Sequence, residues 1–424
     1  MKEKIIMTEK KIILPPKPEI LSPAGNFEKL KSAFLFGADA VYFAGKNFGM
    51  RAAADNFTLD EIENACIYAH SLNKKLYLTV NTILRDGEIP EFKQYLRDIK
   101  SLQEKPDAMI CADIGAATLI KDMLGEVDIH ISTQANTQNH LACLAWANLG
   151  AKRIILAREL SLDDIKLIRE NLPDSVELEC FVHGSMCVSY SGRCLLSNYY
   201  VSRDANRGMC TQPCRWKYYV VEEKRLDVPL EIQEDMSGTY LFSSKDLCMI
   251  DYIDDLVLSG ISAFKIEGRM KSAYYTASIT NAYRIALDKF YEDPDNYIFD
   301  KQLRTEVESV SRREYDTGYF YGRPNLEAKI CETPEYIREK AYLGICVGYE
   351  EESGLAVFEQ RNKAILNQKA QILSPSCIGR DITIDNLYDA ENNPIESAPH
   401  PFMIFKVKTD IPVKKGDILR GVGE

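Results

Sequence analysis

Residues 179–217 read ECFVHGSMCVSYSGRCLLSNYYVSRDANRGMCTQPCRWK, and the plan of the chain is best understood outward from this stretch. It contains four cysteines, with six residues between Cys187 and Cys194, fifteen before Cys210 and three before Cys214. The other eight of the twelve cysteines are scattered over the 424 residues. This concentration of thiols predicts a set of metal ligands, because thiolates bind zinc and iron.

The spacing of the four cysteines leaves the metal open. Structural zinc sites favour pairs of cysteines that are typically about two to four residues apart. Only Cys210 and Cys214 have that spacing. Iron–sulfur clusters also take four thiolates and accept more varied spacing. The residues are therefore compatible with a cluster, with structural zinc, or with unligated thiols.

Around this stretch, short apolar runs alternate with longer amphipathic segments, as they do in βα units. Eight strands are predicted, at Glu19–Leu21, Ala40–Phe43, Leu76–Thr79, Ala108–Ile110, Ile129–Ser132, Arg153–Leu156, Val176–Val182 and Phe264–Ile266. Helices are predicted between them, at Phe27–Phe36, Leu59–Leu72, Phe92–Leu102, Ile114–Leu124, Leu141–Leu149 and Leu162–Asn171. Eight strands with intervening helices favour a closed (β/α)8 TIM-like barrel in the α/β class over an open doubly wound sheet.

The seventh βα unit departs from this pattern. More than sixty residues separate its strand from a predicted helix at Leu247–Leu258, whereas βα loops usually take a handful. The cysteine-rich insertion is assigned to residues 183–245, and a hairpin of Tyr218–Glu222 with Thr239–Phe242 is predicted to close it. A βα loop lies on the C-terminal face of a barrel, where active sites are built.

Beyond the eighth strand the character of the chain changes. Helices are predicted at Ala273–Tyr291 and around Glu306–Arg313, which complete a barrel domain at residues 19–322 after a leader at 1–18. Residues 323–339 are interpreted as a linker. Residues 340–424 are predicted to form a small C-terminal β-barrel domain, with strands at Leu343–Val347, Ala356–Phe358, Ala370–Ile372, Ile382–Ile384, Met403–Val407 and Ile418–Leu419.

The composition sets limits on compartment and partners. No apolar run reaches the roughly eighteen residues needed to span a bilayer, and the start of the chain lacks the pattern of a signal peptide. Twelve cysteines without a secretion signal favour a reducing compartment, so a cytoplasmic protein without a membrane partner is expected. The net charge of -11 argues against indiscriminate nucleic-acid binding. An RNA partner would require a local basic surface.

The insertion provides such a surface in its sequence. From Cys187 to Lys217 the cations outnumber the single acid, Asp204, and aromatic residues are interleaved with them; the cations are Arg193, Arg203, Arg207, Arg215 and Lys217, and the aromatics are Tyr190, Tyr199, Tyr200 and Trp216. Aromatic rings stack on unpaired bases. The alternative is that the arginines are a solvated loop face and the aromatics pack the insertion. A second basic cluster, of Lys406, Lys408, Lys414, Lys415 and Arg420, lies in the β-domain.

Polar residues at predicted strand ends form the candidate active site, because a barrel presents such residues to a ligand. They are Arg51, Asn81, Thr82, Asp113, Gln134, Asn136, Glu159, Glu179, His183, Lys265, Glu267 and Arg269. His183 is the first candidate for proton transfer, since histidine titrates near neutral pH, and Glu179 is the second catalytic candidate. A structural role for His183, orienting the insertion, is the alternative.

With these residues in hand, the chain resembles the U-thirty-two family, catalogued as collagenase-like peptidases. The motifs that carry the resemblance run from about Glu19 to Tyr275: EILSPAGN, GADAVYFAG, FGMRA, ECFVHGSMCVSYSGRCLLS, CTQPCRW, SSKDL and KIEGRMKS. The resemblance implies a (β/α) barrel and a 4Fe-4S cluster held by Cys187, Cys194, Cys210 and Cys214. It also implies hydroxylation of the wobble uridine of tRNA at carbon 5, with prephenate as the source of the hydroxyl group and iron–sulfur assembly proteins as partners.

This implied activity assigns substrate-binding roles. Prephenate is a dicarboxylate and guanidinium groups bind carboxylates bidentately, so Arg51 and Arg269, with Lys265, are its expected anchors. Asn81, Gln134 and Glu267 are the further substrate-binding candidates at the strand ends. Arg203 and Arg207 are expected to contact the tRNA anticodon loop, where bases are already exposed.

Two other classes of function are kept beside the hydroxylase. One is the peptidase that the family name describes, which needs an activated nucleophile or a metal-bound water with an open coordination position. Four cysteine ligands would leave a zinc ion no open position, and the sequence offers no evident Ser/His or Cys/His pair. The other is a non-catalytic RNA-binding protein in which the metal only stabilises the insertion.

Overall fold

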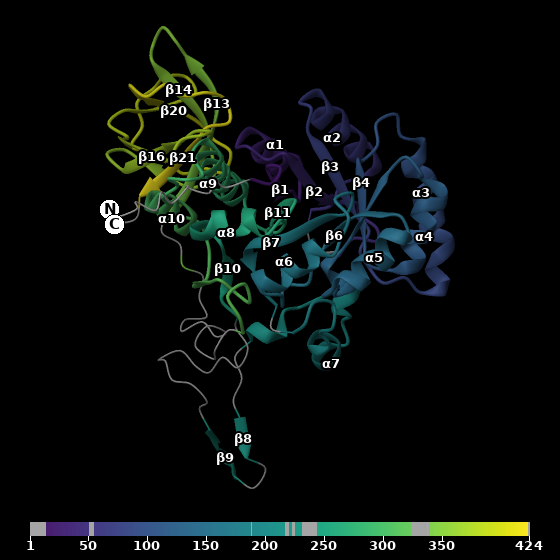
Figure 1. The fold of residues 1–424 in the computed structure, drawn as a ribbon. Coiled ribbons are helices and arrows are strands. Elements are labelled where there is room, and N and C mark those ends of the chain that lie inside the picture. Colours follow the sequence, from purple (N-terminus) through teal and green to yellow (C-terminus); the bar gives the residue numbers. More distant parts are fainter. Residues whose placement is uncertain are drawn as a thin grey trace, which may run out of the picture.

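A computed structural model describes residues 14–50, 55–187, 189–216, 220–222, 225–230, 244–323, 337 and 340–422. Its larger part is a closed parallel barrel of eight strands, in the order β11-β1-β2-β3-β4-β5-β6-β7, with β7 pairing back to β11 (Figure 1). The strands are β1 (Glu19–Pro23), β2 (Ala40–Ala44), β3 (Lys75–Thr79), β4 (Ala108–Cys111), β5 (Asp128–Ile131), β6 (Ala151–Ile155), β7 (Glu177–Ser185) and β11 (Ala263–Ile266). All eight predicted strands are present, and the predicted TIM-like barrel is confirmed.

Helices pack around the strands of the barrel. They are α1 (Phe27–Leu35), α2 (Leu59–Ser71), α3 (Ile89–Ser101), α4 (Ile114–Met123), α5 (His140–Asn148), α6 (Leu162–Glu170), α8 (Ile253–Leu258), α9 (Ala273–Glu292) and α10 (Lys301–Glu308). The helix predicted around Glu306–Arg313 lies earlier, at Lys301–Glu308. Thr58 and Glu61 form a capping box on α2, and Ser161 and Asp164 form one on α6. These caps satisfy backbone N–H groups that would otherwise lack partners.

The insertion after β7 differs from the prediction in two places. The strand β8 (Val220–Glu222) pairs with β9 (Arg225–Leu230), so the hairpin is tighter than the predicted one, whose second strand at 239–242 lies outside the described residues. Asp246–Cys248 forms the strand β10, antiparallel to the end of β7, so the predicted helix at Leu247–Leu258 is wrong in its first turn and begins at Ile253. Helix α7 (Leu196–Val201) lies between the second and third cysteines.

The C-terminal domain is all β, as predicted, and its main sheet is an antiparallel half-barrel in the order β17-β16-β21-β13-β14-β20-β18. Its strands are β13 (Lys340–Glu350), β14 (Leu355–Gln360), β16 (Lys369–Leu373), β17 (Arg380–Thr383), β18 (Leu387–Asp389), β20 (Ile404–Lys408) and β21 (Ile418–Val422), with a separate pair of β15 (Ala364–Ile365) and β19 (Ser397–Ala398). The domain lies against α9 and α10 in Figure 1. Arg420 is fully buried there, 2.6 Å from Glu306 of α10.

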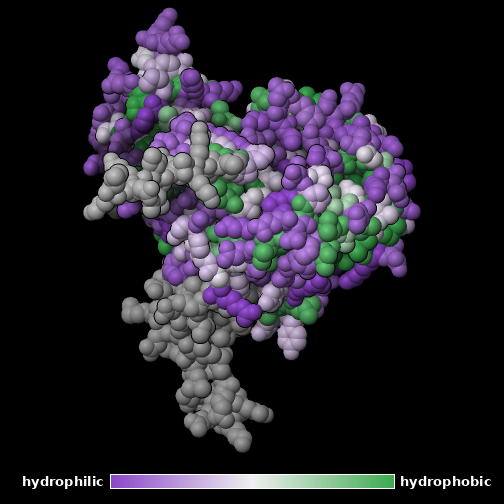
Figure 2. All heavy atoms as spheres, viewed as in Figure 1, coloured by the Kyte–Doolittle hydropathy of each residue, from purple (hydrophilic) through white to green (hydrophobic). Residues whose placement is uncertain are grey.

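The surface in Figure 2 is mostly hydrophilic, with apolar residues gathered over α4 and α5. Leu141 and Leu149 belong to this apolar area and are exposed. Within the described residues, no helix is both long enough and apolar enough to cross a membrane.

Candidate functional site

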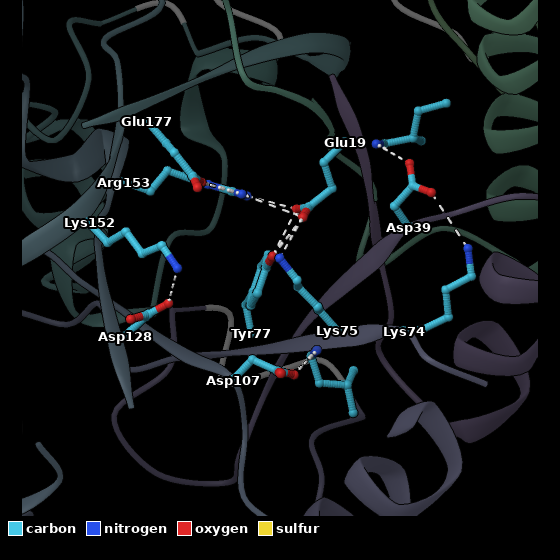
Figure 3. A network of polar contacts seen from close by, with 12 residues as sticks. Glu19, Asp39, Lys74, Lys75, Tyr77, Asp107, Asp128, Lys152, Arg153 and Glu177 are labelled. Atoms are coloured by element: carbon cyan, nitrogen blue, oxygen red, sulfur yellow. Dashed lines mark hydrogen bonds and ion pairs between the residues drawn. The ribbon is translucent and has the colours of Figure 1, made fainter. Parts of the chain in front are cut away.

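The N-terminal ends of the barrel strands are closed by a network of ion pairs (Figure 3). Arg153 of β6 lies 2.7 Å from Glu19 of β1 and 2.6 Å from Glu177 of β7, and the hydroxyl of Tyr77 donates to Glu19 at 2.8 Å. Arg153 is buried, which disfavours its charge, but Glu19 and its other anionic neighbours hold its pKa well above the ordinary value. We call Glu19, Tyr77, Arg153 and Glu177 the barrel floor, and they form a structural plug.

Glu179 and Lys265 form a buried pair one layer above the floor. The Glu179 carboxylate is fully buried and accepts from Lys265 Nζ at 2.7 Å, with Arg153 3.3 Å away. Burial lowers the pKa of Lys265, and Glu179 opposes that shift. The predicted catalytic candidate Glu179 and the predicted anchor Lys265 therefore satisfy each other inside the barrel. This arrangement does not favour a role for Glu179 in proton transfer.

The barrel mouth, at the C-terminal strand ends, brings together several of the predicted substrate residues. Asn81 accepts from the Met50 backbone N–H at 3.1 Å and lies 3.5 Å from the Ser132 hydroxyl. That hydroxyl accepts from the backbone N–H of Gln134 at 3.2 Å. Arg269 is buried and donates to the Met50 carbonyl, so it lies beside the residue that precedes Arg51. Arg51 itself lies outside the described residues.

Glu267 lies at the same mouth with a residue that the sequence did not single out. Glu267 is 3.4 Å from the Tyr42 hydroxyl and 3.8 Å from a guanidinium nitrogen of Arg158. Arg158 also stacks over the ring of Phe181, 3.8 Å from its centroid, and donates to the Ser185 carbonyl at 2.7 Å. Arg158 could have been predicted as a site residue from the sequence, because it lies just after the sixth strand and next to the predicted candidate Glu159.

Three other strand-end candidates have local structural roles. Asp113 caps α4 by accepting from the Ala116 N–H at 2.9 Å, and Thr82 donates to the Phe48 carbonyl at 3.0 Å. Asn136 adopts a left-handed conformation and accepts from Gln138 at 2.7 Å. These contacts shape the loops around the mouth.

The cysteine segment is fastened to the mouth through Ser191 and Gly192. Glu159 accepts from the backbone N–H of Ser191 at 2.8 Å and from its hydroxyl at 3.1 Å. Gly192 has a φ of +72°, and a Cβ at this position would lie 2.1 Å from the carbonyl oxygen of Gln134. Only glycine fits so close an approach between two backbones. The insertion is thus held directly against the loop that follows β5.

The other three cysteines of the insertion affect the pKa of Cys214. Burial raises the pKa of Cys214, Arg215 lowers it, and the charges of Cys187, Cys210 and Cys194 each raise it, so all three lie close enough to act on its thiol. Cys187 and Cys210 are exposed and the other two are partly exposed. Across the described ranges, no three potential ligands stand close enough together to hold a single metal ion.

His183 lies in β7, and its side chain packs against tyrosines of α9. Its ring is enclosed by Tyr275, Tyr283 and Tyr315, with Nε2 3.1 Å from the Tyr315 hydroxyl. Burial, aided by Arg304, lowers the pKa of His183 to about 3, so the ring is neutral at pH 7. This setting suits a structural role for His183, and it does not favour proton transfer to a substrate in the mouth.

Among the basic residues of the insertion, Arg207 forms an ion pair with the barrel, whereas Arg193 and Arg203 are exposed. Arg207 pairs with Glu88 and lowers the pKa of that carboxyl to about 2, and Asp204 pairs with Arg85 at 3.1 Å. Both contacts attach the insertion to the segment between β3 and α3. Arg203 is exposed, as is Arg193, whereas Lys217 lies outside the described residues.

The aromatic residues of the insertion are exposed rather than packed. Tyr199 is 85% exposed, Tyr190 58%, Tyr200 50% and Trp216 40%. The Tyr200 ring lies between Tyr199 and Trp216, at centroid distances of 5.8 and 6.4 Å. We call Tyr199, Tyr200 and Trp216 the aromatic face.

The second basic cluster, in the β-domain, does not form one surface. Arg420 is buried against Glu306, and Lys406 is buried 2.8 Å from Glu350. Lys408, Lys414 and Lys415 are exposed. The five residues of the β-domain cluster therefore do not form a single basic patch, because two of them, Lys406 and Arg420, are buried in ion pairs.

The comparisons with known proteins agree with this architecture. Residues 25–329 match Peptidase family U32, and residues 338–420 match the Peptidase family U32 C-terminal domain. The chain is 34% identical to "tRNA hydroxylation protein P1" of Bacillus subtilis (strain 168), over 97% of this chain and 96% of that one. It is 33% identical to "tRNA hydroxylation protein P" of Escherichia coli (strain K12), over 90% and 92% of the two chains.

A third relative carries a different name. The chain is 33% identical to "Collagenase" of Porphyromonas gingivalis (strain ATCC BAA-308 / W83), over 80% of this chain and 82% of that one. The solved U32 peptidase Mk0906 aligns with a TM-score of 0.40 and 12% identity, over 62% of this chain and 98% of that one. The matches over both domains show that the chain belongs to Peptidase family U32.

Proposed function

We propose that this protein hydroxylates the wobble uridine of tRNA at carbon 5, with prephenate as the source of the hydroxyl group. The names of the full-length relatives in Bacillus subtilis and Escherichia coli support tRNA hydroxylation. The observation that carries the proposal is the fastening of the insertion to the barrel mouth at Ser191 and Gly192. It supports the proposal because the insertion that carries the exposed aromatic face is joined to the polar mouth of the barrel.

The aromatic face supports an RNA substrate. Stacking of a base on an aromatic side chain contributes about 1–3 kcal/mol and tolerates any base, because every base has a π-face. The neighbouring Arg203 is exposed and available to a phosphate. A uridine must leave its stack to reach a barrel mouth, and an anticodon loop presents its bases already unpaired. The partner we propose is therefore the tRNA anticodon loop.

The four cysteines fit a 4Fe-4S cluster better than a single ion. All four thiols lie within one insertion, and only Cys210 and Cys214 have the close spacing typical of structural zinc sites, whereas clusters accept more varied spacing. Cys187, Cys194, Cys210 and Cys214 would hold the cluster, with the Gln212 N–H donating to Cys210 Sγ at 3.4 Å. A bound cluster would supply redox or Lewis-acid chemistry, and the residues of the mouth would bind and orient the substrates.

A peptidase is less well supported by the arrangement. A peptidase with a side-chain nucleophile requires a base beside it, and the candidate base His183 is enclosed by three tyrosines. The polar groups of the mouth, by contrast, are amide, hydroxyl, carboxylate and guanidinium groups suited to binding a polar acid.

The test is a reconstituted reaction under anaerobic conditions. Full-length protein is incubated with unmodified tRNA and prephenate, and the nucleosides are analysed by mass spectrometry. The expected product is 5-hydroxyuridine at the wobble position, formed only when prephenate and protein are both present. Cleavage of a collagen or casein substrate, with unchanged tRNA, would contradict the proposal and favour the peptidase.

A further inference from the structure

The guanidinium of Arg158 is held in the barrel mouth by a contact with an aromatic ring and by a hydrogen bond. Its Cζ lies 3.8 Å from the centroid of the Phe181 ring, and its side chain is 13% exposed. One nitrogen donates to the carbonyl of Ser185 at 2.7 Å. Ser185 lies two residues before Cys187, so Arg158 connects the mouth to the start of the cysteine segment.

The other terminal nitrogen of Arg158 faces Glu267 across a gap. The two atoms are 3.8 Å apart, whereas a direct guanidinium–carboxylate hydrogen bond spans about 2.7–2.9 Å. A polar contact beyond hydrogen-bond range can be bridged by a third group, such as a water or a ligand oxygen. The Arg158–Glu267 pair therefore has the spacing of a pair that accommodates a further polar group.

Other cations of the barrel are paired more tightly. Lys265 Nζ lies 2.7 Å from Glu179, and Arg153 lies within 2.7 Å of both Glu19 and Glu177. These distances are those of direct charged hydrogen bonds. To bind Lys265 or Arg153, a ligand anion would have to displace a carboxylate that is directly hydrogen-bonded to that cation. To bind Arg158, it would not have to break a direct hydrogen bond to Glu267.

We propose that Arg158 binds a carboxylate of the acidic co-substrate and holds it between Glu267 and the start of the cysteine segment. This inference rests on the proposed function, because it assigns the binding group for the dicarboxylate donor. The planar fork of arginine matches the two oxygens of a carboxylate, which the point charge of a lysine does not. Arg158 also places positive charge 3.8 Å from the carboxylate of Glu267.

The test measures prephenate binding to anaerobically purified full-length protein by isothermal titration calorimetry, with tRNA binding and iron content measured in parallel. Arg158→Met is expected to raise the Kd for prephenate roughly 10- to 100-fold, the size of one lost charged hydrogen bond, with tRNA affinity and iron content unchanged. Arg158→Lys should give an intermediate Kd. In the Arg158→Met background, Glu267→Gln should recover part of the affinity, because it removes a repelling charge.

The outcomes separate the inference from the function on which it rests. A wild-type protein that binds no prephenate contradicts the proposed donor and the inference with it. A wild-type protein that binds prephenate, with Arg158→Met binding equally well, overturns the inference alone. Loss of iron, with equal losses of prephenate and tRNA affinity in both Arg158 variants, would also overturn it and assign Arg158 to holding Ser185.

Discussion

At the N-terminal ends of the strands Arg153 contacts Glu19 and Glu177 at 2.7 and 2.6 Å, whereas at the C-terminal ends Arg158 stands 3.8 Å from Glu267. Both ends of the barrel use an arginine of the β6 unit and carboxylates from other strands or from the residues that follow them. The charged groups of the barrel floor form direct ion pairs with one another. In the mouth, Arg158 and Glu267 lie farther apart, beside the cysteine segment. Stability is therefore expected to depend on the floor and ligand binding on the mouth.

The largest effect is expected at the floor. Arg153→Met leaves the buried Glu179 and the carboxylates of Glu19 and Glu177 short of a partner, which should cost roughly 3–5 kcal/mol in the free energy of unfolding. The measurement is urea denaturation. Lys152→Met is the matched control, because its pair with Asp128 is exposed and should contribute less than about 1 kcal/mol. Equal losses in the two variants would contradict the distinction between floor and surface.

The junction of insertion and mouth should respond to a single methyl group. Gly192→Ala places a Cβ 2.1 Å from the Gln134 carbonyl oxygen, so the two backbones must separate, at a cost of roughly 1–3 kcal/mol. We expect faster proteolysis within residues 183–245 and lower iron retention, with the barrel intact. Gly322→Ala is the control: Gly322 also has a positive φ, but a Cβ there meets nothing within 4 Å. Similar proteolysis in both variants would mean that Gly192 does not hold the insertion.

The buried histidine makes stability depend on pH. The pKa of His183 is about 3 in the folded protein, below its ordinary value of 6.5, so its neutral form is favoured by folding. Its contribution is complete above pH 6.5 and is lost as the pH falls towards 3. Between pH 6.5 and 5 this amounts to about 2 kcal/mol. Denaturation of His183→Asn should show a shallower pH dependence over this range, and an unchanged slope would refute the burial argument.

The smallest effect is expected at the exposed face of the insertion. Arg203→Glu should weaken tRNA binding modestly and reduce the slope of log Kd against log salt by about 1, the signature of one lost phosphate contact. Arg207→Glu differs, because it breaks the pair with Glu88 and should loosen the insertion. The double variant Arg207→Glu with Glu88→Arg should restore the ion pair with reversed charges and hold the insertion against the barrel again. A salt slope that is unchanged in Arg203→Glu would remove this face from the tRNA contact.

Local patterns predicted most of the barrel. Strands such as Ala40–Ala44 depend on residues close in sequence, as do the caps at Thr58 and Ser161, and the predicted strands match the structure. The pairing of β10 with β7 and of β8 with β9 depends on non-local contacts that periodicity does not encode. The helix predicted from Leu247 therefore began too early.

The site was harder to predict than the fold. Strand β7 continues to Ser185, so Glu179 lies inside the barrel rather than at its end. The register between β11 and β7 shifts at Lys265 and Ile266, and His183 then faces the helices instead of the mouth. Arg158 was missed because its partners Phe181, Ser185 and Glu267 come from two other strands and their ends.

The most direct test of the account is the metal content of the insertion. Protein purified anaerobically is analysed for iron, sulfide and zinc, with Cys214→Ala as the test variant and Cys377→Ala, an exposed cysteine of the C-terminal domain, as the control. The account predicts about four irons and four sulfides per chain, lost in Cys214→Ala and kept in Cys377→Ala. Stoichiometric zinc without sulfide would contradict the cluster and leave the proposed hydroxylase without its cofactor.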